Sequence, residues 1–196
     1  MAVSSEEPAE PGQWTYDFSD PDGPQLGTVA LEGSNVISTA VDPVVMIAEH
    51  TSVTLTPSYH WSARGLGDRR MALWSGFWIE TPKARVWFAG DTGYGDGSIF
   101  HDLRGKFGAP DIALIPIGAY EPRWFMAPQH VAPEEAVQIF QDIGAEQALG
   151  VHWGTFQLTD EPHDEPVELL QKTLSTKGIP LDQFRALSPG DVYSAA

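Results

Sequence analysis

Val86-Trp87-Phe88-Ala89-Gly90-Asp91-Thr92-Gly93-Tyr94 joins a short apolar run to a turn that carries an acidic residue, Asp91. An apolar run that ends at a glycine is typical of a buried strand. Two histidines repeat the arrangement, because His60 follows the alternating segment Val53–Thr56 and His152 follows the apolar segment Ala148–Val151. In α/β proteins the loops at the carboxyl ends of the strands converge. We therefore expect the two imidazoles and the carboxylate to share one site.

The composition limits what such a site can be. With 196 residues, 42% of them hydrophobic, the chain fits a single domain with a substantial core. The formal charge of −16 repels phosphate backbones and anionic lipid headgroups, which excludes nucleic acid as a partner and makes a membrane surface unfavourable. Since the chain has no cysteine, a transition metal must be held by imidazole and carboxylate groups. The first residues have no basic segment followed by an apolar one, so we expect a cytoplasmic protein.

The order of patterns predicts an α/β domain. Residues 1–25 are rich in Pro, Glu, Asp, Ser and Gly and are interpreted as a flexible acidic leader, and residues 26–196 as the domain, with weak strands before residue 46. Apolar or alternating runs predict strands at 53–56, 74–80, 85–88, 112–117, 148–151 and 184–187. Helices are expected from Pro133 to a stop at Gly144, and from about Asp164 to a stop at Gly178.

The candidate ligands suit a metal, but each also has a structural explanation. Imidazole and carboxylate bind zinc, manganese or iron, and a bound ion lowers the pKa of its water. A single histidine after a strand is more often structural than a ligand, so both interpretations of His60 and His152 stay open. The loop Pro116–Met126 mixes polar and aromatic groups, as a pocket wall or a structural loop does. Arg64, Arg69 and Arg70 form a basic cluster, for an anionic group or for solvent.

His130 directly precedes the helix expected at Pro133. At that position it faces a substrate phosphate beside the helix N-terminus, or it caps the turn.

Five segments in order resemble the second half of the metallo-β-lactamase superfamily, in the branch of N-acylphosphatidylethanolamine phospholipase D and its bacterial relatives. The resemblance runs from about Ile47 to Asp191, and residues 1–46 resemble nothing in that family. It implies an αββα sandwich whose second half is present and whose first half is truncated or replaced. The segments are Thr56–Gly65, Phe88–Tyr94, Ile115–Met126, Gln129–Ala136 and His152–Phe156.

The resemblance implies roles for particular residues. His60 matches a ligand of the first zinc, Asp91 the carboxylate that bridges two zincs, and His152 a ligand of the second zinc. His130 matches an active-site histidine near the scissile phosphate, and it and Asp91 are the implied catalytic residues. The implied substrate-binding wall is Tyr120, Glu121 and Arg123. The implied reaction is phospholipase D-like hydrolysis of a small-molecule or lipid phosphodiester by a metal-activated hydroxide, with one or two zinc ions, or with manganese or iron.

The sequence departs from that family in one respect. The His-x-His-x-Asp-His motif that supplies the remaining ligands is absent, and no two histidines lie closer than ten residues. Three interpretations follow: an enzyme whose site is completed by another chain or a second copy, a catalytically inactive truncated relic, or a partner-binding module. The third rests on an uncovered apolar face formed by Trp74, Phe77, Trp78 and Ile79, which predicts self-association into a homo-oligomer.

Overall fold

The computed structural model describes residues 44–63, 65, 67, 74–188 and 190–194, together with the backbone of three short strands nearer the N-terminus. Those strands are β1 (Ser4–Ser5), β2 (Trp14–Asp17) and β3 (Thr28–Val29), which pair antiparallel in that order. Most of the expected leader, the strand expected within residues 36–39, and the cluster of Arg64, Arg69 and Arg70 lie outside the described residues.

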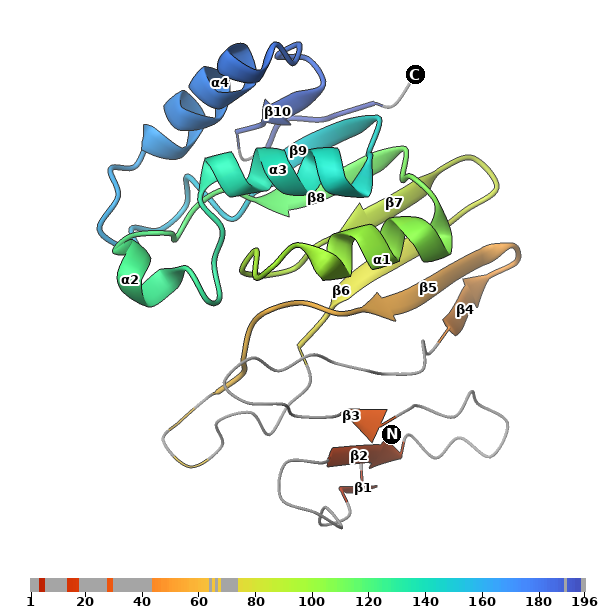
Figure 1. Ribbon diagram of the computed structural model, residues 1–196. Helices are drawn as coiled ribbons and strands as arrows, with labels where there is room; N and C mark the ends of the chain where they lie inside the picture. The colour runs from red at the N-terminus through yellow and green to blue at the C-terminus, as the bar shows by residue number, and fades with distance from the viewer. Residues whose placement is uncertain are drawn as a thin grey trace.

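A seven-stranded mixed sheet forms the body of the described chain, in the order β10-β9-β8-β7-β6-β5-β4 (Figure 1). The strands from β7 to β10 are parallel, whereas β4, β5, β6 and β7 pair antiparallel with one another in sequence. This arrangement confirms the predicted α/β class. The strand bounds are β4 (Val44–Ala48), β5 (Thr51–Thr56), β6 (Gly76–Glu80), β7 (Arg85–Phe88), β8 (Ile112–Pro116), β9 (Gln147–Val151) and β10 (Phe184–Ala186).

Strand direction brings distant loops to one edge of this sheet. Because β5 is antiparallel to β6 and β6 is antiparallel to β7, β5 runs in the same direction as β7, β8 and β9. The segments that follow β5, β7, β8 and β9 therefore leave the sheet at the same edge. These segments carry His60, Asp91, the loop from Ile117 to Pro122, and His152.

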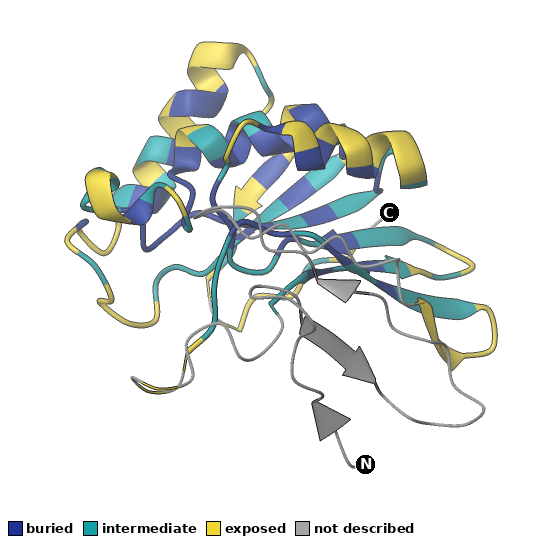
Figure 2. Ribbon diagram, turned by 60° about the horizontal axis from the view of Figure 1, so that its bottom comes forward, coloured by how far each residue is buried: buried dark blue, intermediate teal, exposed yellow. Residues whose placement is uncertain are grey.

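Three helices pack on one face of the sheet: α1 (Ser98–Phe107), α3 (Pro133–Ile143) and α4 (Glu165–Lys177). Figure 2 shows the buried residues concentrated between this helix layer and the sheet. A fourth helix, the single turn α2 (Arg123–Met126), lies outside that layer, near the N-terminus of α3 (Figure 1). Side chains from all three helices and from the sheet share one core, which includes Trp78, Trp87, Phe100, Ile115, Ile139, Ile143, Leu170 and Leu174.

The other face of the sheet is apolar but carries none of these helices. Side chains alternate along a strand, so Trp78 of β6 points into the helix layer, where its ring stacks on Phe107 at 4.9 Å, while its neighbours Phe77 and Ile79 point the other way. Phe77 stacks on Phe88 across the strand pair at 6.3 Å, and both are half-buried. The expectation that Trp78 belongs to an uncovered face was therefore wrong, because the strand period places it in the core.

None of the helices in the described part of the chain has the length and hydropathy that a bilayer span requires.

Candidate metal centre

Asp91 lies between His60 and His152 at the shared edge of the sheet. Its Oδ2 is 3.9 Å from His60 Nε2, and its Oδ1 is 3.5 Å from His152 Nε2. The Asp91 side chain keeps 43% of its surface exposed, whereas the two imidazoles are more deeply enclosed. The structure thus brings together the three residues that the sequence proposes as ligands. Their role in binding a metal stays a prediction.

His130 joins this group from a different part of the chain. Its Nε2 is 3.3 Å from His60 Nε2, and the two rings meet edge to face with centroids 5.0 Å apart. The centroid of the His152 ring lies 5.3 Å from that of His130. Ligand atoms of His60, Asp91 and His130 all lie within 4.8 Å of one another. Two imidazoles and a carboxylate form a donor set that zinc, manganese and iron accept, so the residues present fit a divalent ion.

Hydrogen bonding and burial prepare the imidazoles for this role. His60 Nδ1 lies 2.6 Å from the carbonyl oxygen of Trp61, to which only a protonated Nδ1 can donate, so the lone pair of the neutral ring is on Nε2. Burial lowers the pKa of His60. Burial, together with the neighbouring His60 and His152, lowers the pKa of His130 to about 4. Both rings are therefore neutral near pH 7, as metal binding requires.

Short contacts connect the loops that carry these groups. The backbone N–H of Tyr59 donates to Thr92 Oγ1 at 2.9 Å, and the N–H of Gly93 donates to the Tyr59 carbonyl at 2.7 Å. These bonds join the His60 loop to the Asp91 loop. The Trp61 indole N–H donates to the side-chain oxygen of Gln129, which joins the His60 loop to the residue before His130.

His152 sits in a constrained backbone conformation. Its φ is +62°, a left-handed value that is uncommon for residues other than glycine and recurs at functional sites. The loop after β8 approaches so closely that a Cβ at Gly118 would lie 2.3 Å from the His152 carbonyl oxygen. A glycine at residue 118 is therefore necessary for this placement of His152.

Of the expected substrate-binding residues, Arg123 contacts His130 directly. Arg123 donates from Nη1 to the His130 carbonyl at 2.9 Å and forms a 2.7 Å ion pair with Glu135 of α3. Glu121 accepts the N–H of Arg123, and the buried Tyr120 hydroxyl donates to Glu165 at 3.1 Å. Each of the three thus has a protein partner, and Arg123 holds the His130 loop. Contact with substrate stays a prediction for them.

Glu161 supports the site and was not identified from the sequence. Its buried carboxylate accepts the backbone N–H of Ala119 at 2.6 Å and of Glu121 at 3.0 Å, and so holds the loop after β8. Burial raises its pKa, but hydrogen bonds from Thr159 and from the backbone outweigh burial and leave the pKa below its usual value. A pattern would not reveal this residue, because its partners lie about forty residues earlier in the chain.

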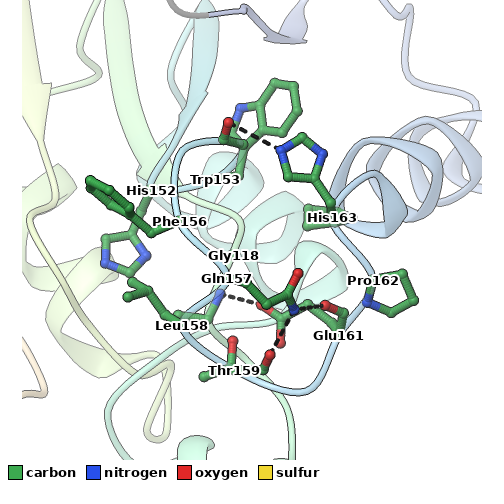
Figure 3. A pocket seen from close by; sticks show the side chains of 13 residues that line it. Gly118, His152, Trp153, Phe156, Gln157, Leu158, Thr159, Glu161, Pro162 and His163 are labelled. Atoms are coloured by element: carbon green, nitrogen blue, oxygen red, sulfur yellow. Dashed lines mark hydrogen bonds between the residues drawn. The ribbon is translucent and has the colours of Figure 1, made fainter.

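An apolar pocket of about 300 Å³ adjoins His152. His152, Trp153, Thr155, Phe156 and Leu158 line it, and the Phe156 and Leu158 side chains are 77% and 65% exposed. Figure 3 shows this part of the β9–α4 loop, where His163 contacts the Gly154 carbonyl at 3.1 Å and ties the loop to the start of α4. The site thus has an apolar rim on the side of His152.

Comparisons with known proteins agree with this architecture. The family model described as "Beta-lactamase superfamily domain" matches residues 16–153, and so begins well before Ile47, where the motif resemblance begins. N-acyl-phosphatidylethanolamine-hydrolyzing phospholipase D 1 of Caenorhabditis elegans is 33% identical over 174 residues, which cover 86% of this chain and 49% of that protein. The mitochondrial N-acyl-phosphatidylethanolamine-hydrolyzing phospholipase D of Saccharomyces cerevisiae is 40% identical over 121 residues, covering 61% of this chain and 26% of that protein.

A solved structure shares the fold. The metallo hydrolase Igni18 of Ignicoccus hospitalis superposes with a TM-score of 0.53 at 23% identity, over 76% of this chain and 55% of that one. The chain spans about half the length of Igni18 and of the nematode relative, and about a quarter of the yeast relative. With a family match over more than half of its residues, this chain belongs to the metallo-β-lactamase superfamily.

Proposed function

We propose that this chain carries the active site of a metal-dependent hydrolase that acts on a phosphodiester in the manner of a phospholipase D. The observation that carries the proposal is the convergence of His60, Asp91 and His152 at one edge of the sheet. Each Asp91 carboxylate oxygen lies within 4 Å of the Nε2 atom of one of the two histidines. Support for a phosphodiester comes from the two relatives, which are named as phospholipases D.

The residues named in the proposal have distinct tasks. His60, Asp91 and His152 would hold the ion, which is zinc, manganese or iron by its donor set. A bound divalent ion supplies Lewis acidity toward a phosphoryl oxygen and lowers the pKa of water. Asp91 presents one carboxylate oxygen toward each histidine, so that an ion between them could be shared. The Trp61 carbonyl holds the proton of His60 at Nδ1 and keeps Nε2 available.

The surroundings favour a substrate with an apolar substituent. The pocket beside His152 is lined by Trp153, Phe156 and Leu158, which suits an acyl chain or an aromatic leaving group. On α2, near the His130 loop, Trp124 is 84% exposed and Phe125 is 55% exposed. The charge of −16 opposes nucleic acid and an anionic membrane surface, so we propose a small-molecule or lipid phosphodiester delivered without a nucleic-acid partner.

A second candidate function is binding of a partner chain. The helix-free face of the sheet presents half-buried apolar side chains that include Phe77, Ile79, Val86 and Phe88. The chain also lacks the His-x-His-x-Asp-His motif that the family resemblance implies. A partner or a second copy that supplies this motif would cover the apolar face and complete a two-metal site. On this alternative the isolated chain binds its partner but has no turnover.

The test combines metal analysis with a chromogenic phosphodiester. Protein purified without chelator and supplied with Zn²⁺ should contain bound metal and hydrolyse bis(p-nitrophenyl) phosphate. Asp91→Asn should abolish turnover and most metal binding, whereas Asp182→Asn, which alters an exposed acid before β10, should retain both. Metal-free protein without turnover would refute the enzyme proposal and leave the binding module as the better explanation.

A further inference from the structure

We infer that His130 is a metal ligand in this chain, so that one ion is held by His60, Asp91 and His130. This inference rests on the proposed metal site and changes its ligand set. The family resemblance implies that His130 contacts the substrate and that other histidines, which this sequence lacks, complete the first metal site.

The distances between the donor atoms fit the coordination of one ion. Ligands at about 2.0 to 2.2 Å from a tetrahedral zinc ion lie about 3.3 to 3.6 Å from one another. His60 Nε2 and His130 Nε2 are 3.3 Å apart, which is this spacing, and Asp91 Oδ2 is 3.9 Å from His60 Nε2. Without an ion, the two nitrogens at 3.3 Å also lie at the long limit of a direct hydrogen bond.

The group of ligand atoms that lie within 4.8 Å of one another includes His130 but not His152. Asp91 Oδ2 is 3.9 Å from His60 Nε2, and Asp91 Oδ1 is 3.5 Å from His152 Nε2. A set of three protein ligands with a fourth position open is the arrangement of a catalytic zinc site. Among the described residues, His152 pairs with Asp91 Oδ1 but belongs to no such group of three donors. His60, Asp91 and His130 therefore form the set of three.

The His130 backbone is held in the position that this role requires. Its N–H donates to the Met126 carbonyl at 2.8 Å, and its own carbonyl accepts from Arg123 at 2.9 Å. Arg123 is in turn paired with Glu135, which also accepts the N–H of Ala132 at the start of α3. The residue is 8% exposed, so its side chain has little freedom to leave the site. This support resembles the outer contacts that orient metal ligands.

Metal titration of the whole chain tests the assignment without relying on turnover. We expect one equivalent of Co²⁺ with the intense visible bands of a four-coordinate ion. His130→Gln should weaken Co²⁺ binding by more than about 100-fold, because loss of an outer-shell contact alone costs about 10- to 100-fold. His152→Gln should weaken it less than His130→Gln does. His101→Gln, which changes an exposed histidine near Asp142, should bind like the parent.

A cysteine at this position gives a second readout that is independent of affinity. The chain has no cysteine, so the Co²⁺ complex of His130→Cys should show a sulfur-to-cobalt charge-transfer band only if residue 130 coordinates the ion. Unchanged affinity and spectrum in His130→Gln, with no charge-transfer band in His130→Cys, would overturn the inference while Asp91→Asn still loses the ion. Binding of no ion by the parent, or equal binding by Asp91→Asn, would refute the proposed function as well.

Discussion

Gly118→Ala should damage the site although it replaces none of the proposed ligands. A Cβ on residue 118 would lie 2.3 Å from the His152 carbonyl oxygen and 3.2 Å from Trp153 Cβ, whereas ordinary contacts begin at 3.4 Å. The backbone at His152 must therefore move by about 1 Å, which exceeds the roughly 0.5 Å within which functional groups have to be held. Overpacking of this kind costs about 1 to 3 kcal/mol. For a chain of this size that corresponds to a melting temperature lower by roughly 2 to 12 °C.

The assay compares thermal unfolding and Zn²⁺ affinity of Gly118→Ala with those of a matched variant, Gly105→Ala. A Cβ on Gly105 in helix α1 meets nothing within 4 Å, and alanine there should raise the unfolding free energy by about 0.5 to 1 kcal/mol. Gly118→Ala should lose stability and should lose metal affinity no more than His152→Gln does, and Gly105→Ala should lose neither. If Gly118→Ala melted and bound Zn²⁺ like the parent, the backbone contact would not position His152.

Three other changes have defined outcomes. Glu161→Gln should lower the unfolding free energy at about pH 7, and the loss should shrink toward about pH 3.5. A carboxylate with a lowered pKa stabilises the folded state above its unfolded pKa and loses that contribution as the pH falls through its folded pKa. Urea titrations that show the same loss at both pH values would contradict this. Trp78→Ala should cost about 3 to 5 kcal/mol in urea unfolding, since the ring is fully buried, and a loss below about 1 kcal/mol would place the ring outside the core. Arg123→Met should cost about 1.5 to 3 kcal/mol, because its charged donor to the His130 carbonyl is lost; an unchanged midpoint would show that this contact does not hold the loop.

The strands and helices with a clear hydrophobic period were predictable from the sequence. The features that depend on contacts between distant segments were not. The apolar runs that predict β7 and β9 end at Phe88 and Val151, as the strands do, so Asp91 and His152 were placed just after strand ends correctly. Helix α1 has a glycine as its N-cap, residue 97, and another within it, residue 105, and its apolar stripe is too short to predict a helix against these two glycines. The approach of His130 to His60 depends on how the loop before α3 packs, and no local pattern encodes such a contact across seventy residues.

The register of β6 shows a second limit. An aromatic and β-rich run predicts a strand, but period two alone does not say which of Phe77 and Trp78 meets the helices. The ring of Phe107 in α1, an element that the sequence patterns did not indicate, determines the answer. The burial of Trp78 can therefore be deduced only when the position of the helix layer is known.

The separation of the candidate donors along the chain links metal concentration to folding. Residues 60, 91, 130 and 152 lie tens of residues apart and meet only when β5, β7 and β9 are paired in one sheet. An unfolded chain offers no such cluster, so an ion that binds here binds the native state and adds about 2.7 kcal/mol to the unfolding free energy at a free concentration of about 100 times Kd. Metal supply would then shift the folding equilibrium of this protein, and chelation would lower its stability as well as stop any metal-dependent reaction.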